Sequence, residues 1–307
     1  MNKPAQVVVA GLLVAAAPAV ADHFGMVAVA PALLVLTRWL AIAALAVWAY
    51  GRRSLTTWIL ISMIIGAEIG HDWPAAAVKL RVLSLIFLRL IKTIIAPLLF
   101  STLVVGIAGH SDLKKVGRMG VKALIYFEVV TTLALFIGLG AINISRAGVG
   151  ITLPEPAEKE QLQTKKQTAS EIILHIFPEN FGKSVVDGEV LQIVVFSIVF
   201  GIALALLPDS KRNPLLHFAE SLAETMFKFT NIIMYYAPIG VGAAIAYTVG
   251  HMGLGILVNL FQLLATLYAA LTVFLLGVLL PVAKLAGVPI RRFASAIAEP
   301  VSIAFAT

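Results

Sequence analysis

Long apolar runs separated by short charged stretches recur along the whole of this chain. Such runs occupy residues 26–50, 55–70, 75–109, 123–144, 190–207, 215–249 and 254–286. A helix needs about 20 residues to cross the hydrocarbon core of a bilayer, and several of these runs reach that length. Because open sheet edges are not tolerated in lipid, the runs predict helices. We therefore predict an all-α polytopic membrane protein.

Prolines and short polar pieces predict that some of these helices are tilted or broken. The run 75–109 would measure roughly 50 Å as one straight helix, which is longer than a bilayer is thick. Pro97 near its middle predicts a kink, and Pro238 and Gly240 interrupt the run 215–249. Short helical pieces are expected over 170–207. We predict loops at 110–122, 151–170 and 208–214.

The charged residues predict which side of the membrane each loop faces, and they do not change the predicted helices. Of 307 residues, 60% are hydrophobic and 13% charged, and the mean hydropathy is +0.97. The formal charge of +7 does not indicate nucleic-acid binding, because eleven of the 23 basic residues lie in four short loops. These are Arg52, Arg53, Lys114, Lys115, Arg118, Lys122, Lys211, Arg212, Lys284, Arg291 and Arg292. This bias predicts cytoplasmic loops of a multi-pass protein of the cytoplasmic (inner) membrane.

Several classes of chemistry are disfavoured by the residues that are missing. The sequence has no cysteine, which excludes disulfides and thiolate metal sites. Its six histidines are scattered and form no HExxH motif, and no GxxxxGK[ST] phosphate-binding loop is present. With no nucleophile–base constellation either, we predict a non-enzyme without cofactors, apart from a coupling proton or sodium ion.

The first 50 residues are predicted as an N-terminal hydrophobic extension. Residues 1–22 match a secretory signal with an Ala-Val-Ala cleavage site at 19–21, and an uncleaved first helix fits equally well. Arg38 falls near the middle of the following span, where a charge is costly unless it faces protein or snorkels. In the next run, Gly66 and Gly70 are spaced for close helix contact. The pattern indicates no role for Arg38 or Glu68.

The last nineteen residues, 289–307, start with Pro289 and the basic pair Arg291 and Arg292. Residues 293–307 are mostly small and apolar, interrupted at Glu299 and Pro300, and are too short to span a bilayer. They fit the rising arm of a re-entrant hairpin. An amphipathic tail on the membrane surface is the alternative.

Five short motifs, in order, resemble one family. They are FLRLIKTIIAP at 87–97, YFEVVTT at 126–132, GEVLQIVVF at 188–196, YAPIG at 236–240 and AFAT at 304–307. Each motif alone is weak. Together they resemble the dicarboxylate and acidic amino-acid:cation symporters, the glutamate transporter family, over roughly residues 55–307.

The resemblance implies a glutamate-transporter-like fold with tilted and broken helices, assembled as a homotrimer. In that fold the scaffold helices would be about 55–110 and 170–250, and the transport-domain helices about 114–147 and 253–286. Residues 289–307 would be the first hairpin arm, where Ala304, Phe305 and Thr307 lead to the tip that contacts substrate. By this comparison we expect an incomplete domain, 51–307, truncated within the first re-entrant hairpin and lacking the main substrate site.

The function implied by the resemblance is secondary active import. Glutamate and aspartate, or C4-dicarboxylates, would enter with protons or sodium by an elevator mechanism. The alternative is an anion-conducting channel or a non-transporting membrane scaffold built from the same helices. The expected partners are an acidic small molecule, the lipid bilayer and two further copies of the chain, with no nucleic acid.

Glu128 is the first candidate for ion coupling, because an acid within an apolar span is a functional candidate by default. A purely structural hydrogen bond to a neighbouring helix is the alternative. In the family, a tyrosine and two hydroxyl residues of this helix hold sodium, and the matching positions here are Phe127, Val130 and Thr131. Only Thr131 keeps its oxygen, with Tyr126 adjacent as a further candidate. This departure favours protons over sodium.

The remaining candidates lie on the two long runs. Arg89 and Lys92, three residues apart, match family positions that line the substrate crevice, and would attract an anion. Snorkelling to lipid phosphates is the alternative. Pro97, Pro238 and Gly240 are predicted hinge or kink positions. Glu224 and Lys228, four residues apart, predict a helical ion pair.

Overall fold

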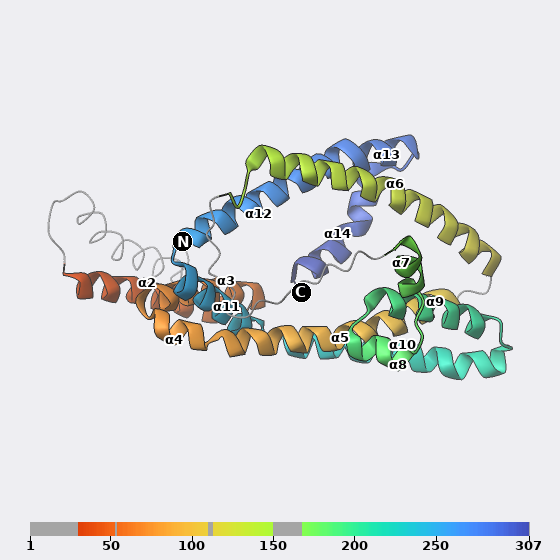
Figure 1. The fold of residues 1–307 in the computed structure, drawn as a ribbon, viewed down its shortest axis with the longest axis horizontal. Helices are drawn as coiled ribbons and strands as arrows, with labels where there is room; N and C mark the ends of the chain where they lie inside the picture. The colour runs from red at the N-terminus through yellow and green to blue at the C-terminus, as the bar shows by residue number, and fades with distance from the viewer. Residues whose placement is uncertain (1–29, 53, 110–112, 150–167, 307) are drawn as a thin grey trace. The chain divides into compact units, whose positions relative to one another are not determined.

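The computed structural model describes residues 30–52, 54–109, 113–149 and 168–306, and this part of the chain contains helices and no strand (Figure 1). The all-α prediction is therefore confirmed for the described residues. Residues 1–22, most of the predicted loop 151–170, and Thr307 lie outside them. The helices are α2 (Pro31–Arg52), α3 (Leu55–Asp72), α4 (Pro74–Lys79), α5 (Arg81–Ala108), α6 (Leu113–Ser145), α7 (Ala169–Ile176), α8 (Phe181–Asp187), α9 (Val190–Ala205), α10 (Asp209–Met234), α11 (Ala237–Met252), α12 (Gly255–Phe274), a π-helical turn η1 (Leu275–Leu279), α13 (Leu280–Leu285) and α14 (Ile290–Ala306).

Four helical segments of the described chain are long and apolar enough to cross a membrane. They are Ala32–Arg52, Pro74–Ala108, Gly117–Ser145 and Gly255–Leu285. A fifth results if α10 and α11, which meet at a 50° bend, count as one span, whereas α9 is apolar but shorter. These helices make the chain a multi-pass membrane protein.

Two of the predicted loops are partly wrong. Helix α6 already begins at Leu113, within the predicted loop 110–122, and α10 begins at Asp209, within 208–214. The side chain of Asp209 lies in the first turn of α10, where a negative charge favours helix formation. Its Oδ1 also lies 2.7 Å from Nη2 of Arg212, one turn later. Polar residues therefore extend these helices beyond their apolar runs.

The two long runs are interrupted at Leu80 and just before Pro238. Residues 75–109 form α4 and α5, which are separated at Leu80, and α5 continues through Pro97. The 50° bend between α10 and α11 falls at Tyr235 and Tyr236. Pro238 is then the second residue of α11, where a proline costs no helical hydrogen bond.

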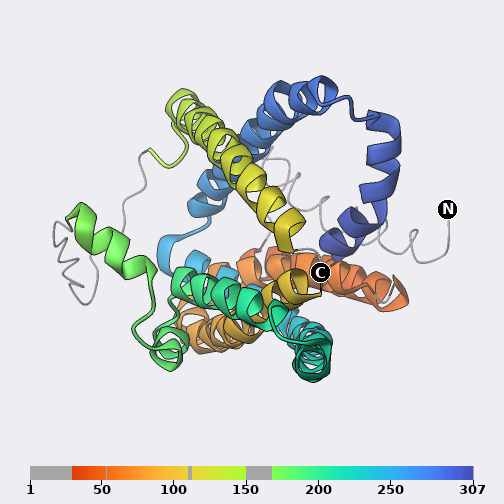
Figure 2. The ribbon, with the colours of Figure 1, turned by 90° about the vertical axis from the view of Figure 1, so that its right-hand side faces the viewer.

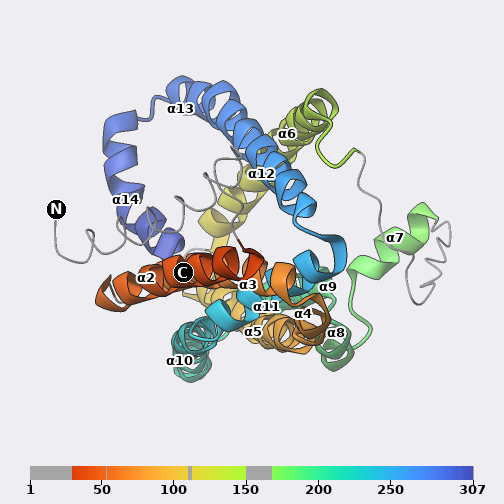
Figure 3. The same cartoon turned by 90° about the vertical axis from the view of Figure 1, so that its left-hand side faces the viewer.

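The described chain divides into two compact units. The first contains α2, α3, α4, the start of α5, and α11, and α3, α4 and α11 lie together in Figure 3. Here α3 and α11 pack backbone to backbone, because a Cβ at Gly66 would overlap the carbonyl of Gly242, and one at Gly70 would lie 2.7 Å from the carbonyl oxygen of Ala246. The predicted close contact of Gly66 and Gly70 is confirmed.

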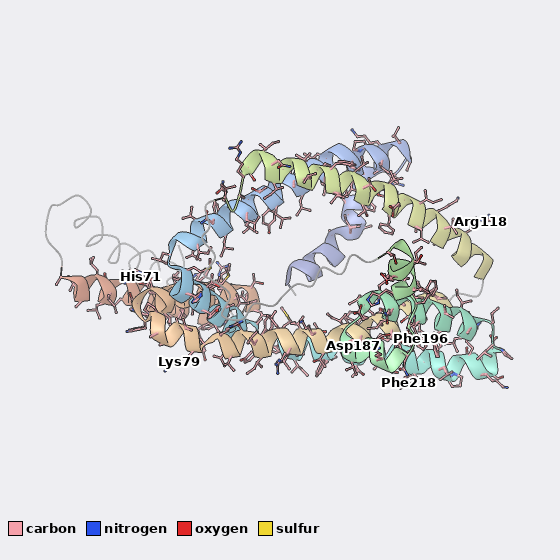
Figure 4. The ribbon with its side chains drawn as sticks, in the orientation of Figure 1. His71, Lys79, Arg118, Asp187, Phe196 and Phe218 are labelled. Carbon is pink, nitrogen blue, oxygen red and sulfur yellow. The ribbon has the colours of Figure 1, made fainter. Side chains whose placement is uncertain are left out.

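The second unit contains most of α5, together with α6 to α10, α12, α13 and most of α14. Its core joins Val104 and Ala108 of α5 to Leu204 of α9 and Ala219 of α10. Beside this core, four phenylalanines pack against one another where α5, α8 and α9 meet, at the position that Phe196 marks in Figure 4. They are Phe100, Phe181, Phe196 and Phe200. Large aromatic surfaces hold α8 and α9 against α5. Figure 2 shows the ribbon from the right-hand side of Figure 1.

Candidate functional site

Two of the three coupling candidates, Glu128 and Thr131, share one exposed face of α6, whereas Tyr126 lies about 200° around the helix from Glu128. Glu128 precedes Thr131 by three residues and Thr132 by four, so that the carboxylate and both hydroxyls lie on the same side of the helix. All three side chains are exposed, and within the described residues neither Glu128 nor Thr131 has a hydrogen-bond or ion-pair partner. The structure thus groups three oxygen-bearing side chains on a membrane-spanning helix.

The other positions of this motif have different surroundings. The ring of Tyr126 contacts that of Phe127 edge-on, with 5.7 Å between the centroids. Val130 is buried, while Phe127 is exposed. Of the positions matched to sodium ligands, only Thr131 presents an oxygen on the exposed face of Glu128.

Arg89 and Lys92 lie one turn apart on α5 but have different surroundings. Lys92 lines a cavity of about 710 Å³ together with residues of α5, α8 and α9, among them Asp187 (labelled in Figure 4). Arg89 is exposed one turn earlier and does not line this cavity. Both side chains are exposed cations, and neither forms an ion pair within the described part of the chain.

A groove of about 540 Å³ lies between α6 and α12 in the second unit. Its walls are mostly small, with Gly140 and Ala141 on α6 and Ala265, Ala269 and Ala270 on α12. At one end the amide of Gln262 donates to the carbonyl oxygen of Ser145 across 3.1 Å. These are the two helices that the resemblance assigns to a transport domain, and among the side chains that the structure describes this one hydrogen bond joins them.

Helix α14 contains the candidates at the end of the chain. It begins at Ile290, where the Phe293 amide donates to the Pro289 carbonyl, and it continues through Glu299 and Pro300. These two residues interrupt the apolar pattern of the sequence but not the helix. Ala304 and Phe305 belong to this helix, and Thr307 lies outside the described residues.

Sequence reasoning missed an ion network between α2 and α3. Arg38 contacts Glu68 and Asp72, which are four residues apart on one face of α3. Two acids one turn apart and a lone arginine in the preceding span were the available signal. The predicted pair of Glu224 and Lys228, in contrast, does not form among the described residues. Both side chains are exposed there, where ion pairs add little.

A second missed cluster joins α7, α8 and α9. The amide of Gln192 donates to the carbonyl oxygen of His175 at 2.9 Å, and its oxygen accepts from the Ser184 hydroxyl at 2.7 Å. Nε2 of His175 lies 3.4 Å from Oε2 of Glu189. The cluster borders a polar cavity of about 330 Å³, and no three acidic or histidine side chains among the described residues converge as metal ligands.

The chain is similar in sequence to several transport proteins. The chain is 41% identical over 256 residues to the C4-dicarboxylate transport protein of Cupriavidus necator, which covers 81% of this chain and 59% of that protein. The same description applies to a protein of Solibacter usitatus, at 39% identity over 83% of this chain and 61% of that protein. The proton/sodium-glutamate symport protein of Bacillus subtilis is 36% identical over 82% of this chain and 61% of its own length.

The chain thus spans about 60% of the length of these curated relatives. The profile of the sodium:dicarboxylate symporter family matches residues 55–307, from the first residue of α3 onward. It is a family of transporters and not a class of enzymes. Since the match covers most of the chain, the protein belongs to the sodium:dicarboxylate symporter family.

Proposed function

We propose that this protein takes part in secondary active import of acidic substrates across the cytoplasmic membrane. Either C4-dicarboxylates or the acidic amino acids glutamate and aspartate would be carried, together with protons or sodium. The observation that carries the proposal is the family match over residues 55–307, shared with relatives described as C4-dicarboxylate transport and proton/sodium-glutamate symport proteins.

We propose protons as the coupling ion, with Glu128 as their carrier. Support comes from the exposed face of α6, where Glu128 stands beside Thr131 and the sodium-type oxygens are replaced by Phe127 and Val130. A carboxylate on a spanning helix can exchange a proton without the oxygen cage that a bound sodium ion requires. Tyr126, which precedes Glu128 by two residues, would be a further candidate from another side of the same helix.

An elevator movement and a homotrimeric assembly complete the proposal. Helices about 55–110 and 170–250 would form the fixed scaffold, and those about 114–147 and 253–286 would move with the arm 289–307. The arm residues Ala304, Phe305 and Thr307 would lead toward the substrate, and Pro97, Pro238 and Gly240 would absorb bending. The close backbone contact of α3 with α11 supports placing both helices in one scaffold, because small residues at an interface let two helix backbones pack closely.

Uptake by the complete gene product in liposomes tests this function. We expect saturable uptake of radiolabelled succinate, glutamate or aspartate that depends on an inward proton or sodium gradient. A protonophore should abolish the proton-driven part. Anion currents without saturable, cation-dependent uptake of any of these substrates would contradict the proposal and favour a channel.

The double variant Arg89→Gln/Lys92→Gln is expected to raise the KM for an anionic substrate by about tenfold, because these exposed cations would no longer concentrate anions nearby. The turnover rate should stay unchanged, and high salt should narrow the difference between the variant and the native protein. The matched control is Lys228→Gln, another exposed lysine without an ion partner among the described residues. Equal KM values for both variants would assign Arg89 and Lys92 to lipid instead.

A further inference from the structure

The face of α3 that is turned away from α11 carries two carboxylates. Gly66 and Gly70 pack on α11, and Glu68 lies two residues from each of them, about 200° around the helix. Asp72 follows Glu68 by one turn. The side chain of Glu68 is 17% exposed and that of Asp72 7% exposed, so both acids are covered by neighbouring protein. Covered acids on an apolar helix are costly unless they are hydrogen-bonded or paired with an opposite charge.

Helix α2 supplies these partners from two consecutive residues. Nε of Arg38 contacts Oε1 of Glu68, and its Nη2 lies 2.5 Å from Oδ1 of Asp72. The indole Nε1 of Trp39 donates to the other oxygen of Asp72 at 3.0 Å. The rings of Trp39 and Trp73 also pack together, with 5.5 Å between their centroids. One guanidinium thus bridges two carboxylates, which its planar fork of donors allows.

On the α2 side, this contact lies outside the residues that the family profile matches. The family profile starts at Leu55, the first residue of α3, whereas α2 ends at Arg52. The acids therefore belong to the part of the chain that the family profile matches, and the arginine belongs to the helix that precedes it. The match of one cation to two covered acids identifies the partner that this face accepts, because a neutral helix would leave both carboxylates uncompensated.

We propose that the acidic face of α3 is a docking surface whose occupant is α2, with Arg38 supplying the counter-charge that allows Glu68 and Asp72 to be covered. On this view α2 is a permanent additional helix of the first unit. Its function is to keep Glu68 and Asp72 away from lipid and to set the register of α2 on α3. The proposal does not depend on transport, since the attachment is a property of the folded protein.

The charge count makes the proposal specific. Removing Arg38 leaves two covered carboxylates without a counter-ion, whereas removing Asp72 leaves one cation facing one anion. The substitution Arg38→Leu should therefore detach α2, and Asp72→Asn should not. A triple variant, Arg38→Leu/Glu68→Gln/Asp72→Asn, carries no uncompensated charge and should keep α2 in place. If packing alone attached α2, Arg38→Leu and the triple variant would be expected to retain α2 to the same extent.

The test is a cleavage assay on the complete gene product in detergent. A specific protease site is inserted after Arg52, the protein is cleaved, the part that begins with α3 is captured by a tag at its far end, and retained α2 is quantified by mass spectrometry. We expect near-complete retention for the native sequence, Asp72→Asn and the triple variant, and loss of α2 for Arg38→Leu. The matched control is Arg52→Leu, which removes an exposed arginine of α2 that stacks on Trp48.

Three results would overturn the proposal. They are release of α2 from the native sequence, retention in Arg38→Leu equal to native, and release in Asp72→Asn equal to that in Arg38→Leu. If Arg38→Leu yields no folded protein, the triple variant decides: recovery of folded protein with α2 attached supports the charge account, and failure to recover rejects it. Because the assay measures no uptake, its outcome is separate from that of the proposed function.

Discussion

Replacing Gly66 with alanine is expected to destabilise this protein more than any other single methyl addition on α3. The added Cβ would overlap the carbonyl group of Gly242, and a backbone carbonyl cannot rotate out of the way as a side chain can. Helices α3 and α11 would have to separate, which also weakens the contact of Gly70 with Ala246. Overpacking of this kind costs about 1–3 kcal/mol, and more where backbone must move. The measurement is thermal unfolding in detergent, in which the variant should show a clearly lower Tm.

The control for Gly66→Ala is Gly138→Ala. Gly138 lies within α6, and no heavy atom outside its own helix turn lies within 4 Å of an added Cβ there. Since alanine favours a helix over glycine by about 1 kcal/mol, the Tm of this control should stay equal or rise slightly. An unchanged Tm for Gly66→Ala would mean that α3 and α11 do not meet through their backbones.

The second large effect is expected for Glu128→Gln in the complete gene product. Glutamine keeps the size of the side chain but cannot exchange a proton, so that substrate entry should no longer carry protons with it. In liposomes with a pH-sensitive dye inside, native uptake should acidify the lumen. The variant should lose this acidification, and an imposed proton gradient should no longer drive its uptake.

Two further variants separate coupling from a structural role for Glu128. Glu224→Gln removes an exposed acid of α10 and should leave the ratio of protons to substrate unchanged. Glu128→Asp retains a carboxylate and should keep partial proton dependence. If Glu128→Gln still acidified the lumen at the native ratio, Glu128 would not be the proton carrier.

Helix positions could be predicted from the sequence because lipid imposes a simple rule. Apolar runs of sufficient length must become helices, and the described helices follow the predicted runs closely. The ends were less predictable. Leu113 and Asp209 begin helices inside predicted loops, since polar residues also continue a helix where it leaves the membrane. The break at Leu80 could not be predicted, because no proline or glycine lies at that position or next to it.

Part of the candidate site could be predicted from the sequence, and part could not. The grouping of Glu128, Thr131 and Thr132 on one face follows from helical spacing alone, so the sequence suffices for it. Lys92 differs, because its cavity is formed with Asp187 and other residues of α8 and α9, almost a hundred positions later in the chain. The spacing of residues along one helix cannot predict that Asp187, on another helix, lines the same cavity as Lys92. The separation of Lys92 from Arg89 became visible only in the structure.

The sequence by itself determined that this is a helical membrane protein and, through its motifs, to which family it belongs. Both follow from local composition, which the bilayer and the family's motifs constrain residue by residue. The tertiary structure alone decided how the charges are matched. From the sequence, Arg38 is a costly charge in an apolar span with no assigned role. In the structure it pairs with Glu68 and Asp72, some 30 positions away on another helix. Burial and pairing are properties of contacts between helices, which no single helix encodes.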